Sequence, residues 1–168
     1  MLQLAAKPLV RDLRELLDPL VALCGLSANV RTEFVVEFTH EGVAYRMPRI
    51  VFTGPAAAHE PEPIRLGVFG GLHGDEPASV LAPIAFLERL AADPVRATGY
   101  ELVVYPLCNP VGYALNHRHN GDGLDLNRQF WRGSAQPEVR ALERELTVNR
   151  FDGLITLHAD DTAEGIYG

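Results

Sequence analysis

The chain has 168 residues, of which 47% are hydrophobic and 22% are charged, and its formal net charge is −7. These values are typical of one globular domain with a sizeable core. The negative charge and the lack of a basic block argue against nucleic acid as a partner, and no uncharged apolar run reaches the roughly 18 residues of a membrane span. Two cysteines, Cys24 and Cys108, are too few for a disulfide framework and indicate a reducing, cytoplasmic compartment.

The N-terminal part of the chain predicts a helix followed by a β-hairpin. Apolar residues recur with helical spacing from Leu9 to Leu23, and we expect Pro19 to kink or end this helix. Two β-rich segments follow, Glu33–Thr39 and Val43–Phe52. The segment His40–Gly42 between them is typical of a hairpin turn.

Strands and helices alternate in the remainder of the chain, which favours an α/β fold with a mostly parallel (mixed) sheet flanked by helices. We therefore divide the chain into a helix and hairpin region, residues 1–63, and an α/β core, residues 64–168, within one domain. The predicted elements of the core are the strand Ile64–Phe69, the helix Pro77–Ala92, the strand Tyr100–Leu107, the helix Pro137–Leu146 and the buried strand Gly153–Leu157.

Two histidines and one carboxylate follow the ends of two of these strands. His73 and Glu76 come after the first strand of the core and His158 after the last, so we expect all three at one edge of a parallel sheet. Their three-residue spacing lets His73 and Glu76 reach one point if the segment makes a helical turn. Either histidine alone would be an ordinary loop or core residue. Together with the carboxylate they predict a catalytic zinc site with one ion per chain, because this ligand set leaves a position for water or substrate.

A long polar segment, Asn109–Ala135, separates the last two helices of the predicted core. Segments of this length are usually functional or disordered, and its glycines and charges make it a poor candidate for the core. Its arginines Arg118 and Arg128 are suited to bind a carboxylate or to stabilise an oxyanion. Without a metal site, solvated surface arginines are an equally good interpretation. We expect His40 and His59 to be solvated.

Four sequence blocks together resemble the zinc carboxypeptidase superfamily, including its succinylglutamate desuccinylase and aspartoacylase branch. The resemblance covers about Ile64 to His158, and the order and spacing of the blocks make it specific. The first 60 or so residues carry no motif of this kind. The blocks are Gly71–Glu76, Asn109–Gly112, Arg118–Arg128 and Leu157–His158, and Gln136-Pro137-Glu138 before a helix is also similar to the family.

The resemblance implies a zinc hydrolase that cleaves an amide bond next to a carboxylate. His73, Glu76 and His158 would bind Zn²⁺, which lowers the pKa of a bound water and polarises a carbonyl. Arg118 would polarise the scissile carbonyl and hold the oxyanion. Asp125 would accept a hydrogen bond from a ligand histidine.

The substrate implied by the resemblance is a peptide or a small molecule with a free carboxylate, which Asn127 and Arg128 would hold. Carboxypeptidases and deacylases of N-acyl amino acids both fit this description. The block that contains Gly74, Asp75 and Glu76 looks slightly more like the peptidases. Neither side-chain specificity nor oligomeric state is indicated by the sequence.

The general base of the family, a glutamate well downstream of the last zinc ligand, has no counterpart in this sequence. Asp160, Asp161 and Glu164 are the only carboxylates after His158, and none has a matching context. Three explanations are open: the chain is a fragment truncated at its C-terminus, a nearby carboxylate such as Glu164 acts as the base, or the domain binds zinc and carboxylates without turnover. We expect the first, with an incomplete hydrolase core.

Overall fold

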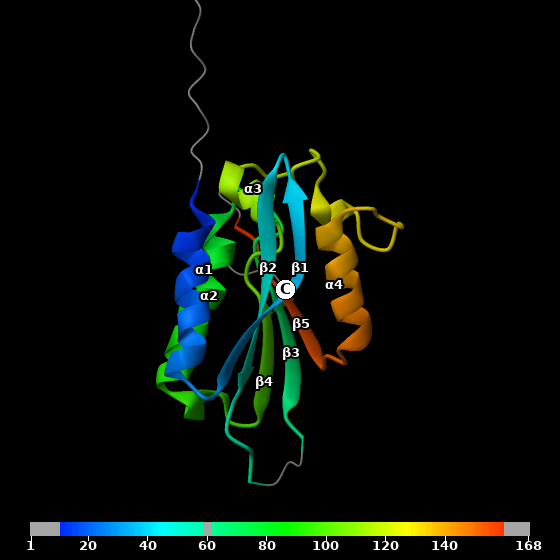
Figure 1. Cartoon of the computed structure of the whole chain (residues 1–168). Helices are drawn as coiled ribbons and strands as arrows, with labels where there is room; N and C mark the ends of the chain where they lie inside the picture. Colours follow the sequence, from blue (N-terminus) through cyan, green and yellow to red (C-terminus); the bar gives the residue numbers. More distant parts are fainter. Residues whose placement is uncertain (1–10, 59–61, 160–168) are drawn as a thin grey trace, which may run out of the picture.

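The computed structural model of the chain describes residues 11–58 and 62–159. Its centre is one five-stranded sheet with the strand order β1-β2-β4-β3-β5. Helices α1 and α2 cover one face of this sheet and α4 covers the other (Figure 1). Each face has its own cluster of buried apolar side chains, so the strands between them are packed on both sides.

Helix α1 spans Leu13–Leu26 and begins at Asp12, whose side chain accepts a hydrogen bond from the backbone N–H of Arg14. The expected start at Leu9 lies outside the described residues. The helix does not end at Pro19, the second of the two expected outcomes, but continues to Leu26. Pro19 and Glu15 are both exposed, so the Glu15 carbonyl that lacks a helical partner can bond to water.

The predicted hairpin is confirmed, with strands β1 (Val30–His40) and β2 (Val43–Thr53) paired antiparallel. His40 pairs with Val43, which leaves a two-residue turn. Both turn residues, Glu41 and Gly42, have positive φ angles of 46° and 78°. This backbone twist matches the twist of the two strands.

The sheet is mixed, as expected. Strand β3 (Ile64–Phe69) pairs in parallel with β4 (Tyr100–Tyr105) on one side and with β5 (Gly153–Thr156) on the other. Strand β2 pairs antiparallel with β4. The three parallel strands therefore bring their carboxyl ends to one edge of the sheet, where the loops that follow β3 and β5 meet.

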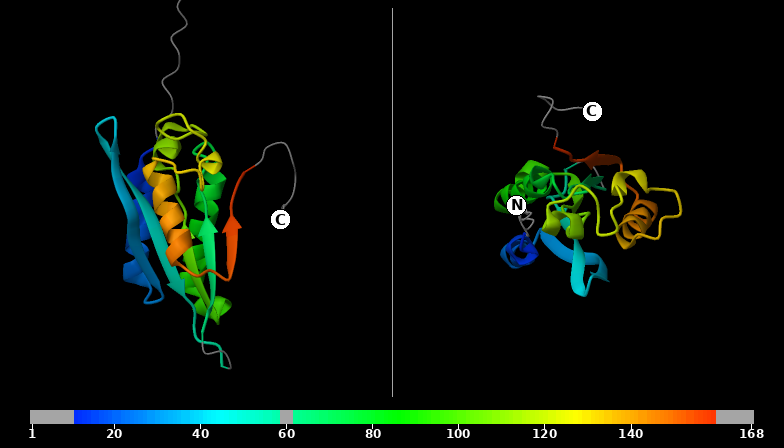
Figure 2. Two further views of the ribbon diagram at one scale, coloured as in Figure 1. Left: turned by 90° about the vertical axis from the view of Figure 1, so that its right-hand side faces the viewer. Right: turned by 90° about the horizontal axis from the view of Figure 1, so that it is seen from above.

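The prediction that the last strand is buried is wrong for β5. Leu154 is 56% exposed and Ile155 is 45% exposed. The physical reason is position: β5 pairs only with β3 within the described part of the chain, and Figure 2 shows it at the margin of the sheet. An apolar sequence favours a strand but does not say which strand occupies an edge.

The polar segment is better packed than its composition predicts. It contains helix α3 (Pro110–Leu115), whose Val111 and Ala114 pack with Tyr45 of the hairpin, and the short helix η2 (Leu126–Arg128), whose Leu126 is fully buried. The expectation of a poor core element is therefore wrong for α3 and for Leu126, whereas residues 116–119 and 131–133 are exposed. The other helices are α2 (Pro77–Ala92), η1 (Pro94–Ala97) and α4 (Pro137–Val148). None of the helices in residues 11–58 and 62–159 is long and apolar enough to cross a membrane.

Candidate metal centre

The loop between β3 and α2 places His73 and Glu76 by a tight backbone path. The Glu76 N–H donates to the His73 carbonyl at 3.3 Å, which makes the expected turn, and Glu76 directly precedes α2. Pro77 at the first helical position has a suitable φ and needs no hydrogen-bond partner there. Gly74 packs directly against α3, where an added Cβ would lie 2.0 Å from the carbonyl carbon of Gly112. No larger residue fits at position 74 without moving the loop.

The structure brings His73, Glu76 and His158 together. The His73 Nδ1 atom lies 2.7 Å from Glu76 Oε1, and the His158 Nδ1 atom lies 3.1 Å from Glu76 Oε2. One donor atom from each residue lies within 4.8 Å of the other two. His73 and Glu76 are buried, whereas the His158 side chain is 33% exposed. The cluster is therefore accessible from the side of β5.

Asp125 lies behind His73, where the sequence resemblance places a hydrogen-bond acceptor. One carboxylate oxygen, Oδ1, is 3.2 Å from His73 Nε2, and the other, Oδ2, accepts a hydrogen bond from Arg118 Nη2 at 3.2 Å. Arg118 also approaches the cluster directly, with Nη1 3.7 Å from Glu76 Oε1. Asp125 thus contacts both a candidate ligand and the candidate oxyanion-binding arginine.

Both carboxylates of this cluster are held in their charged form. Burial raises the pKa of Glu76, but the backbone N–H of Ala159 and the histidines His73 and His158 more than offset it, so the pKa lies below its ordinary value. Burial likewise raises the pKa of Asp125, while His73 and Arg118 lower it further, with the same net direction. Two carboxylates that stay anionic in a partly buried site favour binding of a cation.

The donor set fits zinc. Two imidazole nitrogens and a carboxylate are typical ligands of catalytic Zn²⁺, and ligands about 2.0–2.1 Å from a tetrahedral ion lie roughly 3.3 Å from one another. The distances of 2.7 Å and 3.1 Å between Glu76 and the two histidines are close to this spacing. Asp125 on the second nitrogen of His73 is the kind of outer partner that fixes the tautomer of a ligand histidine.

A cavity of about 650 Å³ opens onto the cluster, and Arg118, Asn127 and the candidate ligands line it together with Asp75. The backbone N–H of Asn127 donates a 3.0 Å hydrogen bond to Asp125 Oδ1. Arg128 is exposed and is not among the residues that line this cavity. The structure therefore brings five of the predicted residues to the cavity and places Asp125 behind His73, but it does not bring Arg128 there.

Two buried asparagines hold this arrangement, and the sequence analysis assigned no role to either. Asn109 accepts from Gly112 N at 2.9 Å and donates to the carbonyls of Leu72 and Arg118 at 3.3 Å and 3.4 Å. Asn120 Oδ1 accepts two backbone N–H groups of the turn between Arg118 and Asp125. An asparagine directly before a proline-initiated helix is a helix-cap signal that identifies Asn109.

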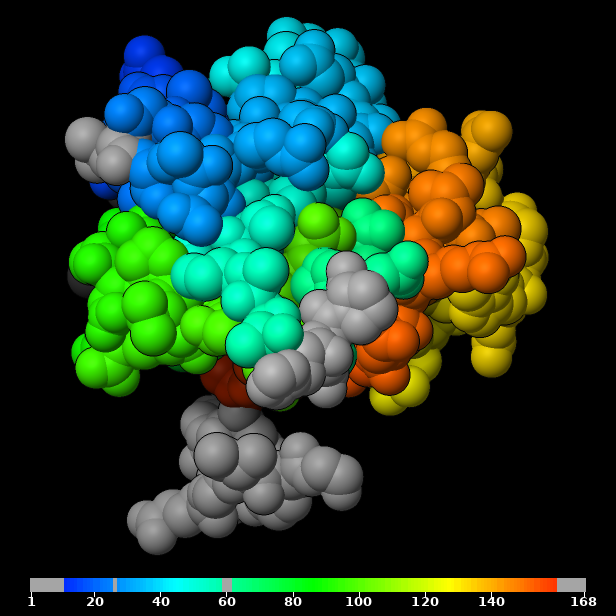
Figure 3. Space-filling view, turned by 90° about the horizontal axis from the view of Figure 1, so that it is seen from below, coloured from blue at the N-terminus to red at the C-terminus, as the bar shows by residue number. Residues whose placement is uncertain are grey.

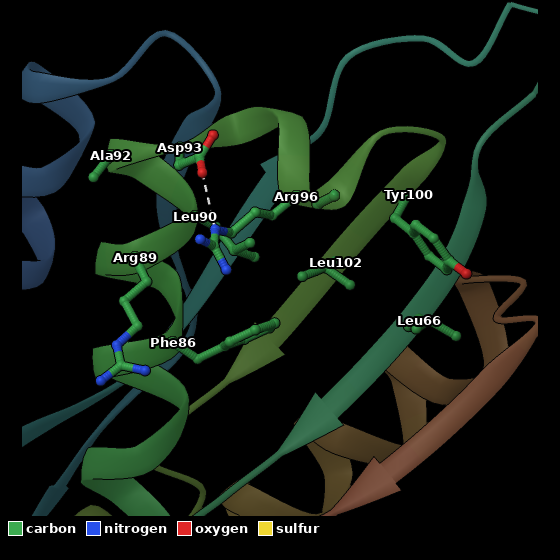
Figure 4. Close-up of a pocket in the computed structure, with 10 residues that line it drawn as sticks. Leu66, Phe86, Arg89, Leu90, Ala92, Asp93, Arg96, Tyr100 and Leu102 are labelled. Atoms are coloured by element: carbon green, nitrogen blue, oxygen red, sulfur yellow. Dashed lines mark hydrogen bonds and ion pairs between the residues drawn. The ribbon is translucent and has the colours of Figure 1, made fainter.

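A second hollow, of about 950 Å³, lies at the opposite end of the parallel strands (Figure 4). Its walls are mainly apolar, from Phe86 of α2 to Leu102 of β4, and its charged groups include the exposed pair Arg96–Asp93. Figure 3 views this end, with the α2–η1 segment (green) and the α4–β5 segment (orange) on opposite sides of the strands. None of the candidate site residues lines this hollow.

Comparisons with known proteins agree with this geometry. No family model matches the chain. It is 31% identical over 105 residues to the carboxypeptidase SOL1 of Arabidopsis thaliana, an alignment of 53% of this chain and 21% of that protein. Two solved structures superpose on 87% and 88% of the chain: a metallo-carboxypeptidase from Burkholderia cenocepacia (20% identity, TM-score 0.73) and one from Pseudomonas aeruginosa in complex with (2-guanidinoethylmercapto)succinic acid (22% identity, TM-score 0.69).

These likenesses confirm the zinc-carboxypeptidase-like fold that the sequence blocks indicated. The chain spans about two fifths of the length of each of the two structures, which is 40% in both cases, and about a fifth of the plant protein.

Proposed function

We propose that the chain carries the metal centre of a zinc-dependent hydrolase that cleaves an amide bond next to a free carboxylate. The observation that carries this proposal is the convergence of His73, Glu76 and His158 on one cavity that Arg118 and Asn127 also line. A bound zinc ion would supply Lewis-acid chemistry and a water of lowered pKa. The free cysteines Cys24 and Cys108 agree with a cytoplasmic location, which is part of the proposal.

Four residues around the metal centre would bind and orient the substrate and the ligands in this reaction. Arg118 would donate hydrogen bonds to the carbonyl oxygen of the scissile amide as it gains negative charge, and its ion pair with Asp125 keeps the guanidinium at the cavity wall. Asn127 would donate to the substrate carboxylate, with Arg128 as its partner once the side chain turns toward the cavity. Asp125 would also keep His73 in one tautomer.

Two substrate classes fit this site: peptides with a free C-terminus and N-acyl amino acids, as in the succinylglutamate desuccinylase and aspartoacylase branch. The similarity to carboxypeptidases, one of them bound to a succinic acid derivative, favours the peptide class. A carboxypeptidase-like reaction that releases a C-terminal residue is therefore our first choice. Deacylation of an N-acyl amino acid is the alternative within the same chemistry.

A second candidate function is a non-catalytic module that binds zinc and carboxylates. The observation in its favour is that Asp75 and Glu76 are the only carboxylates among the described residues lining the cavity, and Glu76 is assigned to the metal. Asp75 has no match to a general base in the family. Asp160, Asp161 and Glu164, which were considered for that role, lie outside the described residues.

The test combines metal analysis with a matched pair of substrates. We expect about one zinc per chain at the His73 centre by elemental analysis. In a protein that extends this chain with the general base of the family, we expect hydrolysis of a peptide with a free C-terminus and not of the same peptide with an amidated C-terminus. Faster cleavage of an N-acyl amino acid by that protein would select the deacylase class. Zinc and carboxylate binding without turnover in that protein would select the binding module. Failure to bind zinc after incubation with the ion would refute both functions.

A further inference from the structure

A second group of donor side chains lies away from the metal centre, around the buried carboxylate of Glu138. This residue is in the first turn of α4 and only 1% exposed. Its Oε2 atom is buried and has no hydrogen-bond partner in the structure. A buried carboxylate oxygen without a partner is costly in a folded protein and calls for an explanation such as a bound ion.

Glu138 lines a small cavity of about 120 Å³, which His40, Asn120, Asp122 and Gln136 also line. The lining comes from three separate segments: the end of the hairpin, the polar segment and the start of α4. Figure 1 shows the hairpin tip and the N-terminal end of α4 at the same end of the molecule. The cavity therefore lies where the hairpin, the polar segment and α4 meet, and it shares no lining residue with the cavity at the metal centre.

His40 lines this cavity and is less solvated than expected from the sequence, because its side chain is only 23% exposed. Its ring lies against Gly121, where an added Cβ would come within 2.6 Å of the ring atoms. The Nδ1 atom is 4.0 Å from Asp122 Oδ1, and the other oxygen of Asp122 accepts a hydrogen bond from Gln136 Nε2 at 3.0 Å. An imidazole and a second carboxylate thus line the same cavity as Glu138.

When no ion is bound, the surroundings of Glu138 favour its protonated form. Burial is the largest influence and raises the pKa of Glu138, and the charge of Asp122 raises it further. The backbone N–H of Glu138, the amide of Asn120 and the charge of His40 lower it without reversing the shift. Asp122 and Glu138 line one small cavity with a single imidazole. A positive ion there would offset the repulsion between the two carboxylates and favour the ionised form of Glu138.

We propose that His40, Asp122 and Glu138 bind a second divalent cation of the class that accepts mixed nitrogen and oxygen ligands, with Zn²⁺ as the representative. In the part of the chain that the structure describes, only His73, Glu76 and His158 already have three donors within 4.8 Å of one another. Binding at the second site therefore requires the Asp122 side chain, which is 59% exposed, to turn toward Glu138. The ion would tie the hairpin to the polar segment and to α4.

The experiment counts zinc ions bound by the metal-free chain in equilibrium dialysis followed by elemental analysis. We expect two equivalents for the unmodified chain and one for either Glu138→Gln or His40→Ala. The matched control is His117→Ala, an exposed histidine of the polar segment that lines neither cavity, and it should keep two. Circular dichroism reports whether each variant is folded. If Glu138→Gln does not fold, the variant His40→Ala provides the test, because His40 is partly exposed.

The variant Glu76→Ala separates this inference from the proposed function. It should keep one equivalent, which the double variant Glu76→Ala/His40→Ala should lose. If the unmodified chain binds one equivalent of zinc and Glu76→Ala binds none, the first centre is supported and the second site is refuted. Water or a proton would then satisfy the Glu138 carboxylate. Retention of two equivalents by both His40→Ala and Glu138→Gln would refute it as well. One equivalent that survives Glu76→Ala and disappears in His40→Ala would support the second site and refute the first.

Discussion

The two halves of the metal centre are supported very differently by the fold. His73 and Glu76 lie between the interior strand β3 and helix α2, and they are 3% and 9% exposed. His158 follows the four-residue strand β5, which pairs with β3 alone among the described strands, and its side chain is 33% exposed. The central half is therefore preorganised by packing from several elements, whereas the edge half depends on one strand pairing and on the contacts of its own residues.

Glu76 is the point at which the two halves meet. One oxygen contacts His73, and the other contacts His158 Nδ1 and accepts from the Ala159 N–H at 2.9 Å. Its backbone is fixed in turn by Ser79, whose hydroxyl donates to the Glu76 carbonyl and accepts from Gly71 N. The carboxylate of Glu76 thus links His158 and Ala159 to His73. Substitutions can test how strongly zinc binding depends on this link.

The largest effect is expected for Glu76→Ala at the proposed zinc centre. This change removes a candidate ligand and both contacts that hold the edge half, so zinc binding at that centre should be lost, well beyond the 10–100-fold weakening typical of supporting residues. Metal titration after removal of bound ions measures the effect. Asp75→Ala is the control, because this neighbouring carboxylate lines the same cavity but is exposed and is not assigned to the metal. Unchanged zinc affinity in Glu76→Ala would show that the ligand set is wrong.

A core substitution at the centre should cost far more stability than one at the edge. Leu87 of α2, the helix that follows Glu76, is fully buried, and Leu87→Ala should lower the free energy of unfolding by about 2–5 kcal/mol. Leu154→Ala on β5 removes a side chain that is 56% exposed and should change it by only about 0.5 kcal/mol. Denaturant unfolding of the two variants measures the difference. Equal losses would contradict the distinction between centre and edge.

A smaller effect on zinc is expected for Asp125→Asn, which removes the charge behind His73. The neutral amide orients the ligand histidine less strongly than the carboxylate does, so zinc affinity should fall about 10–100-fold. Competition with a chromophoric chelator measures this affinity. The control is Asp93→Asn, which alters an exposed ion pair with Arg96 far from the centre. An unchanged affinity in Asp125→Asn would remove Asp125 from the orienting role.

The smallest effect concerns the anchor of α4, the helix that leads into β5. Glu145 is 4% exposed and accepts hydrogen bonds from Arg49 at 2.7 Å, Tyr105 at 2.8 Å and Asn149 at 3.2 Å. Burial raises the pKa of Glu145, but Arg49 and Tyr105 more than offset this, so its pKa in the folded chain is lower than its ordinary value. The stabilisation from the charged form is therefore complete above the pKa of the unfolded chain, about 4.3. It is lost as the pH falls from there through the folded pKa.

Glu145→Gln should accordingly lower the free energy of unfolding by about 1–2 kcal/mol at pH 7 and make it less dependent on pH in the acid range. Denaturant unfolding between pH 7 and the acid limit of the folded state measures both quantities. Glu88→Gln at an exposed position of α2 is the matched control. If the unmodified chain and Glu145→Gln lose stability in parallel on acidification, this carboxylate is not the source of the pH dependence.

The elements with local signals could be predicted closely from the sequence. The strand Ile64–Phe69 and the helix Pro77–Ala92 have the predicted bounds, because apolar periodicity and an initiating proline specify them without distant contacts. The meeting of His73 with His158 followed from a rule of topology, since parallel strands end at one edge. The roles of Arg118 and Asn127 as functional groups stay predictions, although both line the cavity.

Features that arise from distant packing could not be predicted in this way. The exposure of β5 depends on which strands flank it, and its apolar sequence carries no information on that order. Helix α3 is buried because the hairpin covers it, which outweighs the glycines and charges of the polar segment around it. The partner of the second arginine, Arg128, depends on a side-chain direction that neither sequence spacing nor motif order determines.

The parallel pairing of β3 with β5 also has a consequence for the coupling between metal binding and folding. Glu76 and His158 are 82 residues apart in the chain, and bringing the ends of a flexible loop of that length together costs about 4 kcal/mol of conformational entropy. In the folded chain the register that aligns Phe69 with Thr156 has already closed this loop. An ion at the centre would therefore act as a cross-link between distant parts of the sequence, and its release should coincide with separation of the edge strand.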